Sequence, residues 1–328
     1  EGKGGSDSLV GGLGDDVYIV EDSAETIVED SDAGTDTVRS SVNFTLGNNI
    51  ENLVYTDSVT GGVLVGNAGN NSISGNAGAD SLEGQGGVDT LIGGAGDDTY
   101  VVDTVTDRIE ETTGTDMVKA SVSFDLSNTL VGGGNTVENL TYTGSSAATL
   151  TGNSLNNSLI GNNQSNTLEG RGGVDTLSGG TNNDVYIVDT ATDLIEDGGG
   201  ATDVVRSSVS FDLSNSLVGG GTGIEYLVYT GGAVAASLTG NSANNSIVGG
   251  TGADTIEGQG GTDTFDGGAG NDVYIVDSTT DTIVDTGGTD TVRSSVDFSL
   301  STANVASGTG IENLVYTDSV TGGVLVGN

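Results

Sequence analysis

The sequence is dominated by a nine-residue repeat that continues in strict register over long stretches. Residues 66–101 read GNAGNNSIS, GNAGADSLE, GQGGVDTLI and GGAGDDTYV without a gap. Four more copies fill residues 152–187, four fill 240–275 and two fill 2–19. Most of the fourteen copies approach Gly-Gly-x-Gly-x-Asp-x-U-x, where U is an apolar residue. Self-similarity at a fixed short period indicates a repeat architecture in which each copy stacks on its neighbours.

Each block of nonapeptides opens a longer repeat. Tyr18, Tyr100, Tyr186 and Tyr274 occupy equivalent places and are spaced by 82, 86 and 88 residues. This spacing divides the chain into units 1–65 (truncated at its start), 66–151, 152–239 and 240–328, which we expect to form one continuous solenoid. Residues 50–67 and 311–328 are the same string of 18 residues, so we expect the chain to be part of a longer array.

The residue types within one nonapeptide predict a tight turn followed by a short strand. Glycine adopts positive φ angles easily, which lets a six-residue turn close. The eighth position is apolar and its neighbours are mostly polar or small, which is the period of two of a strand. These apolar residues, which we expect to form a thin core between two sheets, are Leu9, Tyr18, Ile73, Leu82, Leu91, Tyr100, Leu159, Leu168, Leu177, Tyr186, Ile247, Ile256, Phe265 and Tyr274. No stretch shows a capped helical period, so we expect essentially no helix.

The G-G-x-G-x-D motifs in this register resemble the RTX, or haemolysin-type, calcium-binding repeat proteins. One such motif is common in turns, whereas fourteen in register form a specific signal. The resemblance implies an all-β fold, a right-handed parallel β-roll or β-solenoid, in which two nonapeptides form one rung (one full coil of the chain). It also implies that the turns bind calcium, and that each ion lies between adjacent rungs, held by their aspartates and by loop carbonyls.

With two nonapeptides per rung, the acids at the sixth position recur on one side every 18 residues. The residues 18 positions after Asp98 and Asp89 are Asp116 and Asp107, which lie beyond the recognisable nonapeptides. Their position predicts a third, degenerate rung after each block. The predicted calcium ligands are Asp7, Asp16, Asp36, Asp80, Asp89, Asp98, Asp107, Asp116, Asp175, Asp184, Asp193, Asp203, Asp254, Asp263, Asp272, Asp281 and Asp290. The apolar positions of the third rungs are Ile27/Val38, Ile109/Val118, Ile195/Val205 and Ile283/Val292.

Two more strands complete each unit. One is the E-x-L-x-Y-T string at residues 51–56, 138–143, 225–230 and 312–317, and the other is the run into the next Gly-Asn, such as residues 148–153. The total is eight strands, or about four rungs, per unit of 82–88 residues. Because eight is even, we expect every unit to start on the same side of the roll.

Stacked carboxylates one strand spacing apart repel one another unless cations lie between them. Calcium suits such turns because it accepts six to eight oxygen ligands in loose geometry, whereas magnesium requires stricter octahedral geometry. We therefore expect several Ca²⁺ ions, with the best sites at Asp80/Asp98, Asp98/Asp116, Asp254/Asp272 and Asp272/Asp290. Columns that begin at Asn71, Asn157, Asn166 and Asn245 should hold weak or empty sites, because an amide brings no charge.

The composition excludes several classes of function. The chain has 47 Asp and Glu residues against 7 Lys and Arg, a net charge of −40, so it lacks a basic footprint for nucleic acid. No apolar run is long enough to span a membrane. With neither Cys nor His, the chain offers no zinc finger, cysteine nucleophile or Ser-His-Asp triad, and we predict that it is not an enzyme. The recurring cations Arg39, Lys119, Arg206 and Arg293 are expected to offset nearby acids.

These observations favour an extracellular structural protein, such as a surface-layer, filament, sheath or adhesin rod, that folds when it binds calcium. The resemblance implies type I secretion to the cell surface or medium. We expect calcium as the main partner, and copies of the chain associated end to end or side by side. Two alternatives stay open: a calcium-binding module of a larger secreted enzyme or toxin, and an ice- or glycan-binding adhesin face formed by outward Ser and Thr residues.

Overall fold

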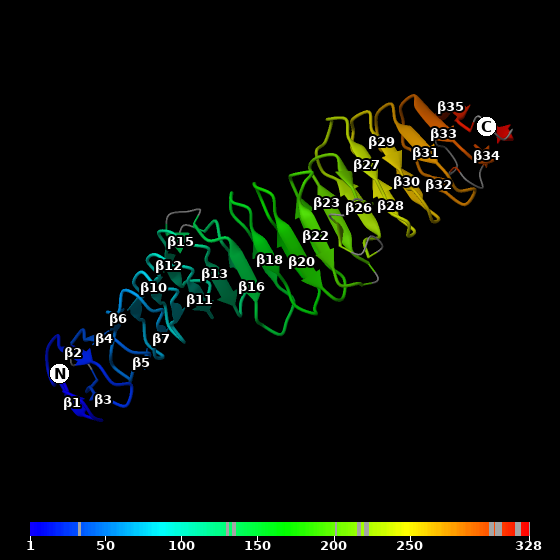
Figure 1. Ribbon diagram of the computed structural model, residues 1–328. Coiled ribbons are helices and arrows are strands. Elements are labelled where there is room, and N and C mark those ends of the chain that lie inside the picture. Colours follow the sequence, from blue (N-terminus) through cyan, green and yellow to red (C-terminus); the bar gives the residue numbers. More distant parts are fainter. Residues whose placement is uncertain are drawn as a thin grey trace. The chain divides into compact units, whose positions relative to one another are not determined.

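The computed structural model describes residues 1–31, 34–128, 131–132, 136–200, 202–214, 218–219, 223–301, 305, 310–318 and 323–327. It divides into two compact units, Glu1–Ile160 and Gly161–Asn328. Each unit is a parallel β-roll, in which successive strands alternate between two sheets and each strand pairs in parallel with strands of the adjacent rungs (Figure 1). The described residues contain no helix. The predicted all-β parallel β-roll is therefore confirmed.

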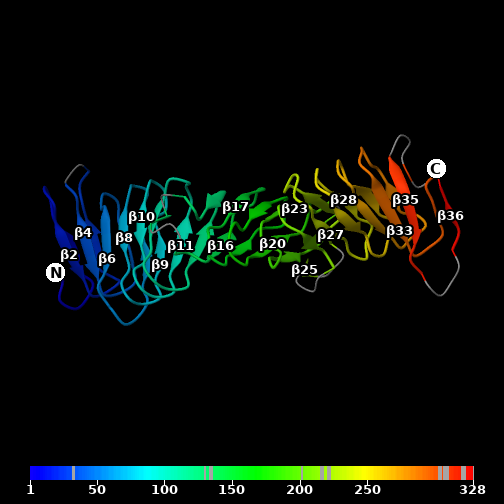
Figure 2. The same cartoon turned by 90° about the horizontal axis from the view of Figure 1, so that it is seen from above.

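Two facing sheets form the first unit, and Figure 2 shows the stacked strands of the first of them from above. In spatial order this sheet contains β2 (Val17–Val20), β4 (Thr37–Ser40), β6 (Asn52–Tyr55), β8 (Ser72–Ser74), β10 (Thr90–Ile92), β12 (Arg108–Glu110) and β15 (Val131–Gly132). The opposite sheet contains β5 (Phe44–Thr45), β7 (Val63–Val65), β9 (Ser81–Glu83), β11 (Thr99–Val102), β13 (Met117–Ala120), β16 (Asn139–Tyr142) and β18 (Ser158–Ile160). Two further pairs are β1 (Ser8–Val10) with β3 (Thr26–Val28), and β14 (Phe124–Asp125) with β17 (Thr149–Thr151).

The second unit repeats this construction. One side contains β19 (Thr167–Glu169), β21 (Val185–Val188), β23 (Val204–Ser207), β26 (Tyr226–Tyr229), β28 (Ser246–Val248), β30 (Thr264–Asp266) and β32 (Thr282–Ile283). The other contains β20 (Thr176–Gly180), β22 (Leu194–Asp197) and β25 (Val218–Gly219), and then β24 (Phe211–Asp212), β27 (Ser237–Thr239), β29 (Thr255–Glu257), β31 (Val273–Val276), β33 (Asp290–Ser294) and β35 (Ile311–Tyr316). Strand β34 (Phe298–Ser299) pairs with β36 (Leu325–Val326).

The core is the thin apolar layer between the two sheets. On one sheet of the first unit, Leu53, Ile73 and Leu91 stack in consecutive rungs with no exposed surface. Leu82 and Tyr100 do the same on the facing sheet. All of the predicted eighth-position residues lie in strands and are buried, except Leu9, which is half-buried. The alternation seen in the sequence thus decides which side chains enter the core.

The predicted third rung forms in every repeat, with Leu91 paired to Ile109 and Tyr100 paired to Val118 as an example. The expectation that every unit starts on the same side of the roll is wrong. Beyond the predicted strands, every repeat contains a two-residue strand, at Phe44–Thr45, Phe124–Asp125, Phe211–Asp212 and Phe298–Ser299, and two repeats contain a further one, at Val131–Gly132 and Val218–Gly219. Tyr18 therefore lies in the sheet of β2, whereas Tyr100 lies in the opposite sheet of the same unit. In each compact unit the equivalent tyrosine sites thus lie in opposite sheets, because the additional short strands change the side on which the following strands fall.

Candidate metal centre

The parallel register stacks the sixth-position acids directly above one another. In the column of Asp80, Asp98 and Asp116, the N–H of Asp80 donates to Oδ1 of Asp98 at 2.7 Å, and the N–H of Asp98 donates to Oδ1 of Asp116 at 2.8 Å. The N–H of Asp116 then donates to Oε2 of Glu138 at 2.9 Å. One oxygen of each of these acceptor carboxylates is thus fixed by the backbone of the preceding rung, which leaves the other oxygen to face the turn.

The same strand register places every predicted ligand in such a column. Except for Asp7 and Asp16, which are half-buried, all of the predicted aspartates are buried. The columns are Asp7 with Glu25, Asp16 with Asp36, Asn71 with Asp89 and Asp107, Asp80 with Asp98 and Asp116, Asp175 with Asp193, Asp184 with Asp203, Asp254 with Asp272 and Asp290, and Asp263 with Asp281. Their role as calcium ligands remains a prediction.

The second oxygen of several of these carboxylates is buried without a hydrogen-bond partner. Oδ2 of Asp98 and of Asp116 are two examples, and Asp16, Asp36, Asp89, Asp184, Asp203, Asp263, Asp272 and Asp290 share the feature. Loss of hydration first, and then the charge of nearby Glu111, raise the pKa of Asp98 to about 6 and that of Asp116 to about 7. A buried carboxylate oxygen that accepts no hydrogen bond is unfavourable, so each of these Oδ2 atoms requires a proton or a cation.

A third acid, which the sequence analysis missed, completes four of these pairs. The four clusters are Asp16/Glu29/Asp36, Asp98/Glu111/Asp116, Asp184/Asp197/Asp203 and Asp272/Asp285/Asp290, and in each one the three ligand oxygens lie within 4.8 Å of one another. The third acid follows the acid of the tyrosine nonapeptide by 13 residues in every repeat. This constant offset is a sequence signal that could have identified Glu29, Glu111, Asp197 and Asp285.

Each third acid belongs to the degenerate rung, next to the first glycine of the tyrosine nonapeptide. Ile92 pairs with Glu110, so Gly93 is the neighbour of Glu111 in the preceding rung. A Cβ atom on Gly93 would overlap the Tyr100 hydroxyl and Oδ2 of Asp98, and it would also meet Oε2 of Glu111 at 2.7 Å. The absence of a side chain at this glycine leaves the space into which the cluster oxygens project.

Substitution of this glycine should therefore disrupt the cluster. We expect Gly93→Ala to reduce the number of bound calcium ions and to lower the urea midpoint of unfolding in calcium, because its Cβ displaces ligand oxygens. Gly86→Ala is the matched control, since a Cβ there has no heavy atom within 4 Å. Equal calcium stoichiometry and equal urea midpoints for the two variants would contradict this geometry.

Turns that carry asparagine are closed without an ion. Oδ1 of Asn71 accepts the N–H of Asn67 at 2.7 Å, and its Nδ2 donates to the carbonyl of Ile50 at 2.9 Å. Asn245 makes the equivalent bonds to Asn241 and Ile224. An amide supplies both a donor and an acceptor, whereas an ionised carboxylate only accepts. This difference supports the expectation of weak or empty sites at asparagine columns.

The first acid of two columns is also capped by backbone groups. Both oxygens of Asp80 accept N–H groups, from Gly62 at 2.6 Å and from Asn76 at 2.8 Å. Asp254 is capped in the same way by Ala236 and Gly250. Among the four best predicted pairs, Asp98/Asp116 and Asp272/Asp290 thus combine a third acid with orphaned oxygens at both aspartates.

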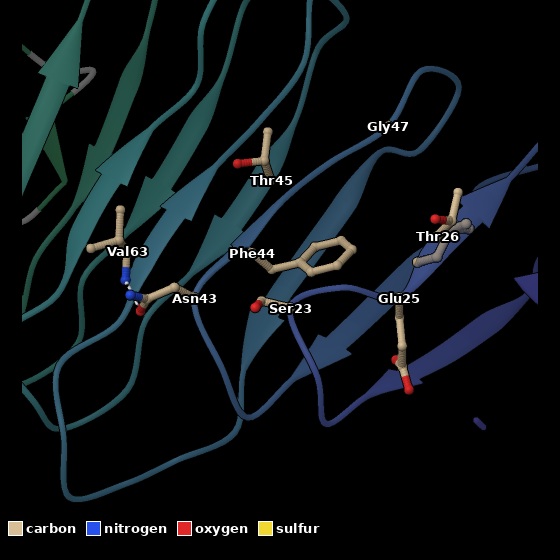
Figure 3. Close-up of a pocket in the computed structure, with 9 residues that line it drawn as sticks. Ser23, Glu25, Thr26, Asn43, Phe44, Thr45, Gly47 and Val63 are labelled. Atoms are coloured by element: carbon tan, nitrogen blue, oxygen red, sulfur yellow. Dashed lines mark hydrogen bonds between the residues drawn. The ribbon is translucent and has the colours of Figure 1, made fainter. Parts of the chain in front are cut away.

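A surface pocket near the N-terminal end lies apart from the four clusters. Figure 3 shows Ser23 and Glu25 from the loop before β3, facing Asn43 and Phe44 at the start of β5. Oδ1 of Asn43 accepts the N–H of Val63 at 2.8 Å. Among the residues that line this pocket, Glu25 alone ionises, so the pocket does not bring together an acid and base pair.

The donor set of the clusters fits calcium. All of the side-chain groups are hard oxygen ligands, and a separation within 4.8 Å is twice a Ca–O distance of about 2.4 Å. In the described part of the chain, Lys3, Arg108 and Arg171 form ion pairs at the surface, and none of these pairs includes a cluster acid. A bound calcium ion would supply the missing positive charge and hold adjacent rungs together. Across the described chain, Arg39, Lys119, Arg206 and Arg293 form no such contact pair, and their offset of nearby acid charge stays a prediction.

Comparison with known sequences agrees with this geometry. Residues 1–20, 65–100, 151–186 and 239–274 match the RTX calcium-binding nonapeptide repeat in four copies. No curated protein matches the chain. No helix in the described residues is long and apolar enough to cross a membrane. The four matched blocks coincide with the stacked turns, and the chain therefore contains four copies of the RTX calcium-binding nonapeptide repeat.

Proposed function

We propose that this chain is an extracellular structural segment whose β-roll is held together by calcium between its rungs. The observation that carries the proposal is the set of buried carboxylate oxygens that have no hydrogen-bond partner. A roll with those charges uncompensated is destabilised by burial and by repulsion along each column. Calcium binding removes both costs, so the free energy of binding becomes free energy of folding.

The expected location follows from calcium supply. Extracellular calcium modules bind with dissociation constants of about 10⁻⁴–10⁻³ M, which the external medium can saturate and the cytosol cannot. A chain with a net charge of −40 would stay extended before export and fold after it. Type I secretion, which is typical of RTX repeat proteins, suits this order of events.

A calcium titration followed by far-ultraviolet circular dichroism tests the proposal. We expect the strand signal to develop with a midpoint of about 0.1–1 mM calcium, and the chain to be unfolded at cytosolic calcium. Magnesium at the same concentrations serves as the control and should not replace calcium. Complete folding at submicromolar calcium would contradict folding after export.

Association between copies is part of the same proposal. Arg39, Lys119, Arg206 and Arg293 are exposed at equivalent strand positions, although the chain is strongly acidic. Arg39 lies between Ile19 and Val54 on its sheet. These cations could contact the acidic turns of a neighbouring copy. We propose no catalytic activity, and the enzyme-module and ice- or glycan-binding alternatives stay predictions.

A further inference from the structure

We propose that each repeat contains a second kind of cation site, formed by the three-carboxylate cluster and a tyrosine hydroxyl, which fills before the sites formed by two aspartates alone and binds trivalent cations more tightly than calcium. The inference rests on the calcium binding proposed above and adds a distinct class of ligand set to it. The sites are the four clusters defined by the third acids Glu29, Glu111, Asp197 and Asp285.

The charge of the cluster sets it apart from a nonapeptide pair. Asp98, Glu111 and Asp116 are at most 6% exposed, and together they carry a formal charge of −3. Two unit charges at 4 Å interact by about 1 kcal/mol in water and about 4 kcal/mol near a protein surface. The third carboxylate therefore strengthens the attraction for a cation beyond that of two aspartates. A trivalent ion neutralises the three charges, whereas calcium leaves one uncompensated.

The tyrosine hydroxyl is an independent indication of a ligand. Tyr18 is 5% exposed and its hydroxyl has no hydrogen-bond partner. A Cβ atom on Gly11 would overlap this hydroxyl, Oδ2 of Asp16 and Oε1 of Glu29 together, so the three oxygens converge on one point. A buried hydroxyl that forms no hydrogen bond and converges with two unpaired carboxylate oxygens offers a third oxygen ligand at that point.

The other three repeats show what the hydroxyl does without an ion. Tyr186 donates to Oδ1 of Asp197 at 3.0 Å, and Tyr274 donates to Oδ2 of Asp285 at 2.5 Å. Tyr100 donates to Glu111 in the same manner. A neutral donor orients the third carboxylate without cancelling its charge, so the cluster is organised before the cation arrives.

The third acid also accepts an N–H group of its own turn, as Oε1 of Glu111 does from Thr113 at 2.9 Å, but regular rungs form the equivalent turn with glycine. In the same column, the preceding rungs carry Gly75 and Gly93 where the degenerate rung carries Glu111. Glycine therefore fits this position in a regular rung. Substitution of the third acid by glycine therefore removes a ligand and places at this position the residue that the nonapeptides have there.

Terbium luminescence provides the test, because the chain has 9 Tyr and no Trp. A tyrosine beside bound Tb³⁺ sensitises its emission. For the full chain we expect sensitised emission to saturate near four equivalents of Tb³⁺, one per cluster, with a midpoint at least about tenfold below that of calcium-induced folding. Glu29→Gly/Glu111→Gly/Asp197→Gly/Asp285→Gly should lose this emission and bind about four fewer calcium ions by equilibrium dialysis.

The control removes four charges elsewhere. Glu83→Gln/Glu110→Gln/Glu169→Gln/Glu257→Gln changes acids at strand positions outside the clusters, and it should retain both the emission and the stoichiometry. If the glycine variant does not fold in calcium, Glu111→Gly alone should still lose one equivalent. Unchanged emission and stoichiometry in the glycine variants would overturn the inference while calcium-dependent folding stands. A wild-type chain that binds no calcium would instead contradict the proposed function.

Discussion

In EDTA, the chain should be unfolded at about pH 7.5 and should regain strand structure when the pH is lowered to about 4.5. Burial raises the pKa of Asp89, Asp98 and Asp184 to about 6 and that of Asp116 and Asp263 to about 7. A carboxyl group whose pKa is raised on folding binds more protons in the folded state. Its contribution to stability is present below its unfolded pKa of about 4 and is lost as the pH rises through 6 to 7.

The effect should be large because it is repeated along the roll. A shift of two pKa units corresponds to roughly 3 kcal/mol for one carboxyl group. Circular dichroism between pH 4 and 8 measures the effect, once with EDTA and once with calcium. In calcium the dependence should reverse, because protons compete with the ion for the same oxygens. A calcium-free chain that is more folded at pH 7.5 than at pH 4.5 would contradict this account of the columns.

The variant Asp98→Asn/Asp116→Asn should have opposite effects with and without calcium. Without calcium it removes two buried charges and should shift the pH midpoint of folding upward, towards neutral pH, by about one unit or more. With calcium it removes ligands and should raise the calcium concentration required for folding. The structure already shows that an asparagine can replace the aspartate of a column, since Asn71 closes its turn with hydrogen bonds alone.

The matched control is Asp97→Asn, next to the column but exposed. Oδ1 of Asp97 accepts the N–H of Thr115 at 2.9 Å, and an amide oxygen can accept the same bond. This variant should leave both midpoints unchanged. Asp98→Ala and Asn71→Ala give a further comparison, because the first should reduce bound calcium whereas the second should lower stability without changing the stoichiometry. Loss of stability by Asp98→Asn/Asp116→Asn under both conditions would argue against cation binding there.

The sequence was sufficient to predict the acid columns because a strict period of nine fixes both the strand and the turn. The pair Asp98/Asp116 follows from that period, and Asp184/Asp203 follows from it with one residue inserted, even where the nonapeptide signature is lost. The third acid could not be placed in the same way. Glu111 occupies a position that is glycine in the nonapeptides, so its proximity to Asp98 depends on how the degenerate turn folds.

The phase error has a similar physical origin. The additional strand at Phe44–Thr45 is only two residues long, and its pattern is a short alternation of Val42, Phe44 and Leu46. Phe44 is buried in the core, as are Phe124, Phe211 and Phe298. So short a strand is stabilised by its neighbours in adjacent rungs rather than by its own propensity. Its omission from the count reversed the side on which each following repeat was expected to begin.

An anomalous difference map from crystals of the calcium-loaded protein tests the central claim most directly. The account predicts calcium peaks within about 2.4 Å of the orphaned Oδ2 atoms of Asp98 and Asp116, and of their counterparts Asp272 and Asp290. A well-ordered roll grown in millimolar calcium, with these four oxygens hydrogen-bonded to protein or water and no anomalous peak beside them, would contradict it.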